Sequence, residues 1–153
     1  MIKFALIILM TVGNALYAQD ALKEARINLT KAVDDDKTCS LMINKLTNHQ
    51  NATEMAYLGA YYAISAQHQF LPTNKLKNFN KGKKLIEAAV LKDPTLSEVR
   101  YLRLLIQSQS PKFLGFHKSI ETDQNFLCQN YKNITNLDLK NKINNLLKKD
   151  CTI

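Results

Sequence analysis

The sequence predicts an all-α fold, an array of about seven helices stacked as antiparallel hairpins. Apolar residues recur at helical spacing through almost the whole chain. Four glycines and three prolines in 153 residues suit helices with short connections better than a turn-rich β fold. The stretch AYLGAYYAISA, residues 56–66, is apolar all round a helix and carries no charge. We therefore expect this helix to have neighbours on more than one side.

We interpret residues 1–18 as a signal peptide that is removed on export. Lys3 supplies a positive charge, FALIILMTVG is a short apolar run, and Ala18 ends a plausible cleavage site. The apolar run is shorter than the roughly 20 residues that a membrane-spanning helix needs. Residues 19–153 are then expected to form a single helical domain that is periplasmic or secreted and has no transmembrane span.

Apolar periodicity and helix-end signals divide the mature chain into elements. The acidic run Asp34–Asp36 is expected to be a solvated connection. Thr53 is a good N-cap, and Thr95 and Glu98 have the spacing of a capping box. A short turn at Leu76 and Phe79 is expected before the fourth helix. The expected helices are about Asp20–Val33, one through Cys39–Leu46, one from Thr53 to the LPT of residues 71–73, one through Gly82–Val90, one through Leu96–Gln107, one through Ile120–Tyr131 and one of about Asn136–Lys149.

Two of these helices carry a recognisable pattern. The matching positions are Met55, Leu58, Gly59 and Tyr62, followed by Gly82, Ile86, Ala89 and Pro94. They resemble a degenerate tetratricopeptide (TPR) repeat, with Met in place of the first aromatic residue. The connection from Tyr62 to Gly82 is about eleven residues longer than the standard repeat has. This resemblance implies a TPR-like array of hairpins in which small residues such as Gly59 and Ala63 let helices approach closely.

A second resemblance covers more of the chain. The runs YLGAYYAISAQHQFLPTNKLKNFNKGKKLIEAAV and DPTLSEVRYLRLLIQSQSPKFLGF are similar to those of small exported bacterial helical proteins of unknown function. The resemblance implies export and a helical fold, and it implies no catalytic residues.

The sequence favours a non-enzymatic interaction module that binds a protein partner in the cell envelope, without a cofactor. No glycine-rich phosphate loop is present, and no pair of histidines has metal-ligand spacing, because His49, His68 and His117 are far apart. Cys39, Cys128 and Cys151 would enter an oxidising compartment, where one disulfide with one thiol left over is an option and no disulfide is another.

Arg100 and Arg103 are the first candidate for partner binding. They lie three residues apart on an otherwise apolar helix, where they would face the array rather than water. Such arginines suit a carboxylate or phosphate ligand. The favoured alternative is internal pairing, and the acids expected nearby are Glu87, Glu121 and Asp123.

The loop SPKFLGFHK, residues 110–118, is the second candidate, through Lys112, Phe113 and Phe116. Loops carry function more often than core positions do, although apolar loop residues also tuck into neighbouring grooves.

Two other classes of function stay open. One is a ligand-binding protein or hydrolase that uses Arg100 and Arg103. The other is binding of anionic lipid or nucleic acid through the basic segment Lys75–Lys84. The lysines there alternate with apolar and amide residues and no nucleic-acid motif surrounds them, so no nucleic acid is expected as a partner.

Overall fold

The computed structural model describes residues 20–48 and 51–147, and within these ranges the chain is all-helical, with no strand. This confirms the all-α class. Residues 1–18, the expected signal peptide, lie outside the described residues. Residues 20–28 form a helix that we call the leading helix. The elements that follow are α2 (Lys31–Asp34), α3 (Asp36–Leu46), α4 (Ala52–His68), α5 (Pro72–Lys92), α6 (Ser97–Gln109), η1 (Lys112–Leu114), α7 (Ile120–Asn130), η2 (Tyr131–Asn133) and α8 (Leu137–Leu147).

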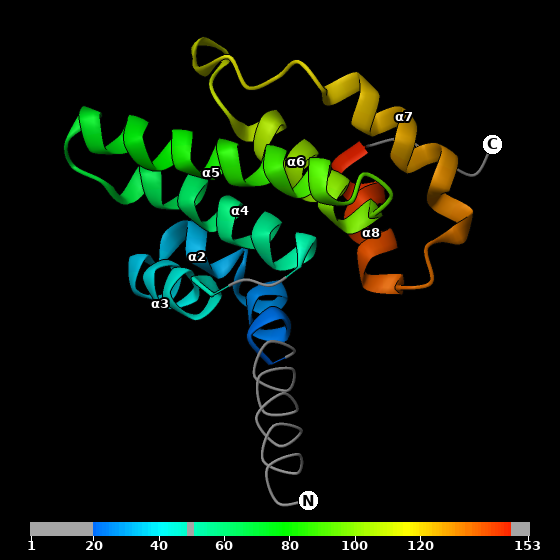
Figure 1. Ribbon diagram of the computed structural model, residues 1–153, viewed down its shortest axis with the longest axis horizontal. Coiled ribbons are helices and arrows are strands. Elements are labelled where there is room, and N and C mark those ends of the chain that lie inside the picture. Colours follow the sequence, from blue (N-terminus) through cyan, green and yellow to red (C-terminus); the bar gives the residue numbers. More distant parts are fainter. Residues whose placement is uncertain (1–19, 49–50, 148–153) are drawn as a thin grey trace, which may run out of the picture.

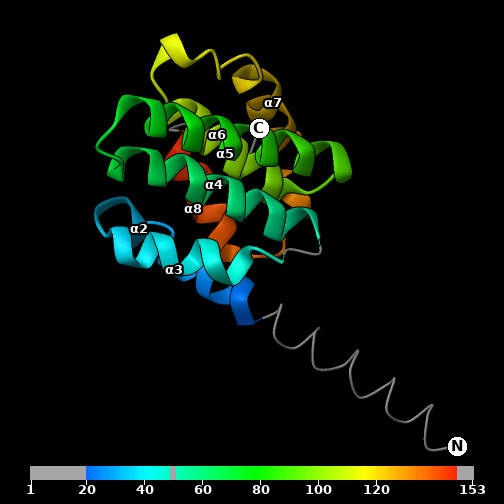
Figure 2. The same ribbon diagram turned by 60° about the vertical axis from the view of Figure 1, so that its left-hand side comes forward.

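The helices α4 and α5 lie side by side at the centre of the molecule (Figures 1 and 2). In Figure 1, α2 and α3 lie below α4, whereas α7 lies at the upper right and α8 below it. Helix α6 contacts α4, α5, α7 and α8. Helix α4 contacts α2, α3, α5 and α6. Residues 56–61 of α4 are accordingly all buried, which confirms that the uncharged stretch has neighbours on several sides. None of the described helices is both long and apolar enough to span a bilayer.

Small residues set the close crossing of α4 and α5. A Cβ on Gly59 would lie 2.8 Å from the backbone oxygen of Gly82 and 2.8 Å from Cγ1 of Ile86. A Cβ on Gly82 would lie 2.5 Å from the oxygen of Gly59 and 2.7 Å from the nitrogen of Ala63. The two helix backbones are therefore in direct contact, as the small residues of the sequence led us to expect.

The predicted turn at Leu76 and Phe79 is wrong, because α5 is one continuous helix of 21 residues. Leu71 is its N-cap, and Pro72 occupies the first turn, where a missing N–H costs nothing. Residues 69–71 alone separate α5 from the end of α4. The eleven extra residues between Tyr62 and Gly82 thus lengthen two helices instead of forming an inserted loop.

Helix ends also differ from the sequence prediction. The N-cap of α4 is Asn51, whose side chain accepts from the backbone N–H of Glu54 at 2.9 Å, and Thr53 lies inside the helix. The Thr95 backbone and hydroxyl instead donate to Asp93, so the predicted capping box is wrong. The sequence rules fail here because several residues near each end have side chains that suit a cap.

The first predicted helix, residues 20–33, is interrupted by a turn at residues 29–30. Asp34 then ends α2, and Asp35 caps α3 by accepting from the backbone N–H of Lys37 and the hydroxyl of Thr38. The hydrogen bond from Thr38 lowers the pKa of Asp35. The acidic run is therefore a helix boundary as well as a connection.

Cys39 is a fully buried free thiol, whereas Cys128 is disulfide-bonded and Cys151 lies outside the described residues. The Cys39 Sγ donates to the backbone oxygen of Tyr61 at 3.3 Å. Burial raises the pKa of this thiol to about 12, so little thiolate forms at neutral pH.

We expect a thiol reagent at pH 8 to modify Cys39 at least about 100-fold more slowly in the folded than in the unfolded chain. Equal rates would show that the site opens freely.

The buried thiol of Cys39 and the buried phenol of Tyr101 are expected to make the protein less stable at alkaline pH. Burial raises the pKa of the Cys39 thiol from 9.0 and that of Tyr101 from 10.0, each to about 12. The folded state therefore holds these protons more tightly than the unfolded state. The contribution of these two groups to the free energy of unfolding is fully present below pH 9.0 and is lost as the pH rises toward 12. Denaturant midpoints measured from pH 7 upward should fall in this window, and a flat profile would contradict the assignment.

Candidate functional site

A groove of about 880 Å³ lies on one side of the helix array. Its lining comes from the leading helix, α2, α4, α5, α6, the η1 segment and α8, so residues far apart in the sequence meet there. Most of the lining side chains are apolar, and they include Leu29, Val33, Ile64, Leu76, Leu105 and Phe113. An apolar groove of this volume is in the range of protein ligand sites.

Side-chain hydrogen bonds fix the leading helix and α2 beside α4. The hydroxyl of Tyr61 donates to the oxygen of Ala25 at 2.7 Å, and Nε2 of His68 lies 2.9 Å from the oxygen of Ala32. The two contacts are seven residues apart on both segments. The segments therefore run side by side in the same direction.

Helix α6 contacts α4 and runs in the same direction. Tyr57 of α4 contacts Glu98 of α6, and seven residues further along each helix Ile64 and Leu105 both line the groove. The groove thus follows three segments that run in parallel, the leading helix with α2, α4 and α6, and Lys142 of α8 adds to its lining.

An ion pair joins the leading helix to α6 at the edge of the groove. Nε and Nη2 of Arg26 donate to the two carboxylate oxygens of Glu98, each at 2.8 Å, and the hydroxyl of Tyr57 donates to Glu98 at 2.9 Å. The hydrogen bond to Glu98 raises the pKa of Arg26, and burial raises that of Tyr57. Glu98, which the sequence assigned to a capping box, is therefore the carboxylate that orders three helices.

The charged residues of the groove are all basic. Arg26, Lys75 and Lys142 line it, and the described part of the lining holds no aspartate or glutamate. Lys142 pairs with Asp138 on its own helix at 2.7 Å. Lys75 is exposed. Glu98 and Asp138 balance the charges of Arg26 and Lys142, so the groove combines an apolar floor with one basic residue, Lys75, that has no ion-pair partner among the described residues.

The predicted arginine pair is engaged within the protein. Arg103 donates from Nε and Nη2 to the carboxylate of Asp123, at 2.7 Å each, and from Nη1 to Glu87 at 2.8 Å. Arg100 donates to Asp123 at 3.0 Å and to the oxygen of Pro94 at 3.2 Å. Arg103 is 5% exposed and Asp123 is 0% exposed. This confirms the favoured alternative, internal pairing.

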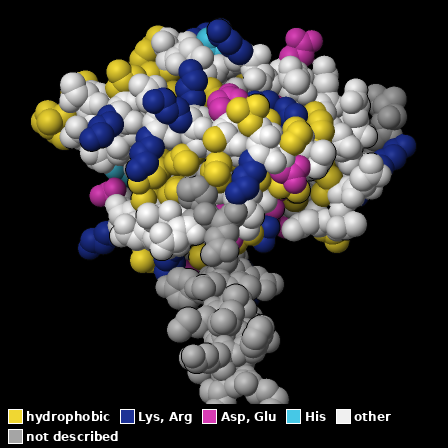
Figure 3. Space-filling model, viewed as in Figure 1, with side chains coloured by type: hydrophobic (Ala, Val, Ile, Leu, Met, Phe, Trp, Pro, Cys, Tyr) yellow, Lys and Arg dark blue, Asp and Glu magenta, His cyan; other side chains and the backbone are white. Residues whose placement is uncertain are grey.

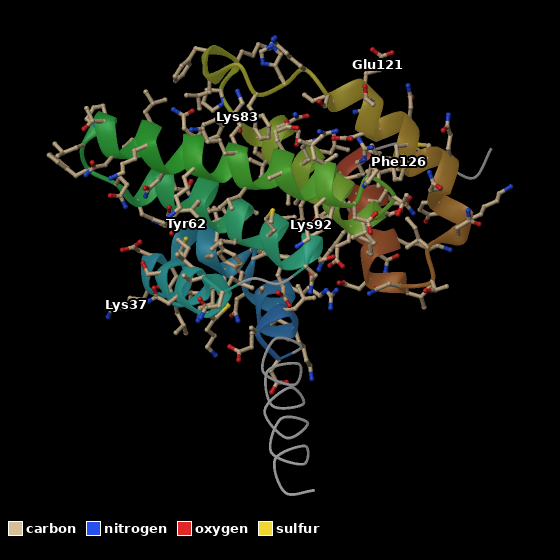
Figure 4. The ribbon with its side chains drawn as sticks, viewed as in Figure 1. Lys37, Tyr62, Lys83, Lys92, Glu121 and Phe126 are labelled. Carbon is tan, nitrogen blue, oxygen red and sulfur yellow. The ribbon has the colours of Figure 1, made fainter. Side chains whose placement is uncertain are left out.

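The surroundings of the pair explain its ionisation. Burial alone would lower the pKa of Arg103, but hydrogen bonds and charge from Asp123, with Glu87 in support, outweigh it, so the pKa is raised. The Arg100 guanidinium carbon lies 4.8 Å from the ring centre of Phe126. Glu121, the third acid expected near the pair, is exposed and points away from α6 (Figure 4).

The predicted binding loop divides into two environments. Phe116 is buried and packs edge-to-face on Phe79 with ring centres 6.0 Å apart. Nζ of Lys83 lies 3.4 Å from the oxygen of Gly115, which ties the loop to α5 (Figure 4). Lys112 is exposed, and Phe113, which is 86% exposed, stands at the groove.

The basic segment Lys75–Lys84 lies on α5. Nζ of Lys81 donates to the hydroxyl of Tyr62 at 2.7 Å and lies 4.0 Å from its ring centre. Lys83 contacts the loop, as described above, and Lys75 lines the groove. On the face in Figure 3, lysine and arginine side chains are spread among apolar and uncharged ones.

Sequence reasoning missed the groove and the bridge between Arg26 and Glu98. A signal for the groove was present, because α6 is apolar on two sides, through Tyr101, Leu104 and Leu105 as well as Val99 and Leu102.

The residues described hold no cluster of three or more His, Cys, Asp or Glu side chains that would suit a metal ion. No family model, curated protein or solved structure matches this chain.

Proposed function

We propose that this protein is an exported, non-enzymatic interaction module whose groove binds a segment of a protein partner in the cell envelope. The observation that carries the proposal is the apolar lining of the groove, which reaches side chains that stay exposed at its mouth. Val33 is 42%, Leu76 49% and Phe113 86% exposed. Exposed apolar surface that continues into a concave site is typical of binding surfaces.

The TPR-like architecture is part of this proposal. The central contact between Gly59 and Gly82 joins the two halves of the repeat pattern. The leading helix with α2, α4 and α6 follow one another in the same direction, as the first helices of successive repeats do. In such arrays, these helices line a concave surface that binds partners.

Export is supported by the disulfide at Cys128, because disulfides persist in oxidising compartments. We expect the exported protein to lack residues 1–18 and to begin at Gln19. Intact-mass measurement of protein from the cell envelope or medium checks this directly. A mature protein that retains Met1 would contradict cleavage.

Two alternatives receive less support. The arginines proposed for a ligand or a hydrolase already donate to Asp123, Glu87 and Pro94, which leaves little of either guanidinium for a substrate. Binding of anionic lipid or nucleic acid through residues 75–84 should weaken steeply with added salt. Binding in an apolar groove should depend on salt much less.

The decisive experiment compares two substitutions on one helix. Leu76→Glu places a charge at the groove, and Leu91→Glu places the same charge on α5 outside it, where Leu91 is 82% exposed. Cross-linking in the cell envelope followed by mass spectrometry should recover a partner with the native chain and with Leu91→Glu. The Leu76→Glu variant should lose it while keeping its melting temperature. Recovery of the same partner with all three chains would overturn the proposal.

A further inference from the structure

We propose that the segment bound in the groove is a short apolar run with an acidic residue at one end. This inference rests on the proposed function and assigns the chemistry of the partner. It is carried by Lys75, a basic residue without an ion-pair partner among the described residues, which lies at one end of the apolar floor.

The length of the apolar floor follows from α6, because Tyr101 and Gln109 of this helix both line the groove. Eight residues of helix rise about 12 Å. A bound segment would cover this length with about four extended residues or about eight helical ones. Leu105 and Ile106 lie between the two ends and supply apolar contacts.

One end of the floor carries Arg26 and Lys142. Arg26 is bonded to Glu98, which lies about one helical turn before Tyr101. Lys142 pairs with Asp138, and the charge of Asp138 acts on Tyr101. Both cations therefore lie near the start of α6, where Glu98 and Asp138 already balance their charges.

The other end carries Lys75. It lies in the first turn of α5, which follows the end of α4 after three residues, and Ala66 and Gln67 of α4 line the same part of the groove. Lys75 makes no ion pair within the described part of the chain, and it is exposed. An acidic side chain of a ligand could pair with it without displacing an internal partner.

The polar groups of the lining favour a peptide over a hydrocarbon chain. Gln109 presents an exposed amide, and Thr30 an exposed hydroxyl, beside the apolar floor. These groups can exchange hydrogen bonds with a peptide backbone, whereas an acyl chain offers none to them. The exposed ring of Phe113 also extends the apolar surface beyond the groove.

The test selects random linear peptides of about 12 residues, displayed on phage, against residues 19–153 of the native chain. We expect the enriched sequences to combine an apolar run with aspartate or glutamate at one end of it. Leu76→Glu should weaken the best peptide at least about tenfold, whereas Leu91→Glu should leave its affinity unchanged. Lys75→Glu should weaken it at least about threefold, whereas Lys84→Glu, on the same helix outside the groove, should not.

The inference fails if no peptide is selected, if the selected peptides show no excess of acidic residues, or if Leu76→Glu leaves their affinity unchanged. Vesicles of phosphatidylglycerol and phosphatidylethanolamine form the second arm. If they bind the native chain but not Leu76→Glu, the groove takes lipid instead. If groove-dependent capture in the envelope persists while the peptide selection fails, the acidic chemistry is wrong and the proposed function stands. If capture ignores the groove, the proposed function itself fails.

Discussion

Asp123→Ala should lower the free energy of unfolding by about 3–5 kcal/mol, the range for breaking a buried ion pair from one side. The carboxylate of Asp123 is fully buried and accepts from both Arg103 and Arg100. Its removal leaves Arg103, which is 5% exposed, with Glu87 as its remaining carboxylate partner. A buried guanidinium that loses a bidentate partner must either draw in water or move, and both disrupt the contact of α6 with α7.

Denaturant unfolding of the variants measures this effect, and the second acid of α7 provides a control. Glu121→Ala should change the free energy of unfolding by less than about 0.5 kcal/mol, because Glu121 is exposed. The double variant with Arg103→Ala should lose less than the sum of the two single losses, since it removes the unpaired charge as well. Native stability in Asp123→Ala would mean that both arginines find water without cost.

The sequence predicted correctly those features that depend on the residues of a single helix. The uncharged run of residues 56–66 required neighbours on several sides, and α4 has them. Arg100 and Arg103 on an apolar helix required partners, because a buried charge is expensive when unpaired. Two of the three acids expected for them, Glu87 and Asp123, are the ones found.

The remainder depends on contacts between distant segments. The turn expected at Leu76 and Phe79 is absent because α5 stays helical through a lysine- and asparagine-rich stretch whose Phe79 is buried against Phe116. Glu98 has capping-box spacing, yet it binds Arg26, 72 residues away. The groove is made by chain segments from residue 26 to residue 142. The periodicity of apolar residues within one helix does not predict which distant segments come into contact.

Gly59→Leu should lower the free energy of unfolding by about 3 kcal/mol, at the upper end of the range for overpacking. The added Cβ alone would lie 2.8 Å from the backbone oxygen of Gly82, and a backbone atom cannot rotate away as a side chain can. Glycine inside a helix costs about 1 kcal/mol relative to alanine, so the substitution gains helix propensity and must still lose overall. The helices α4 and α5 would have to separate, which would also disturb the groove wall that they share.

Ala88→Leu on α5 is the matched control, since Ala88 is exposed and the same side chain is added there without meeting a neighbouring helix. Its free energy of unfolding should stay within about 0.5 kcal/mol of the native value. Gly82→Ala provides an independent check from the other helix, because a Cβ there would lie 2.5 Å from the oxygen of Gly59. Both glycine variants should therefore destabilise despite their better helix propensity. If either one stabilises the protein, α4 and α5 do not cross at the distance described, and the small residues of the repeat pattern have another cause.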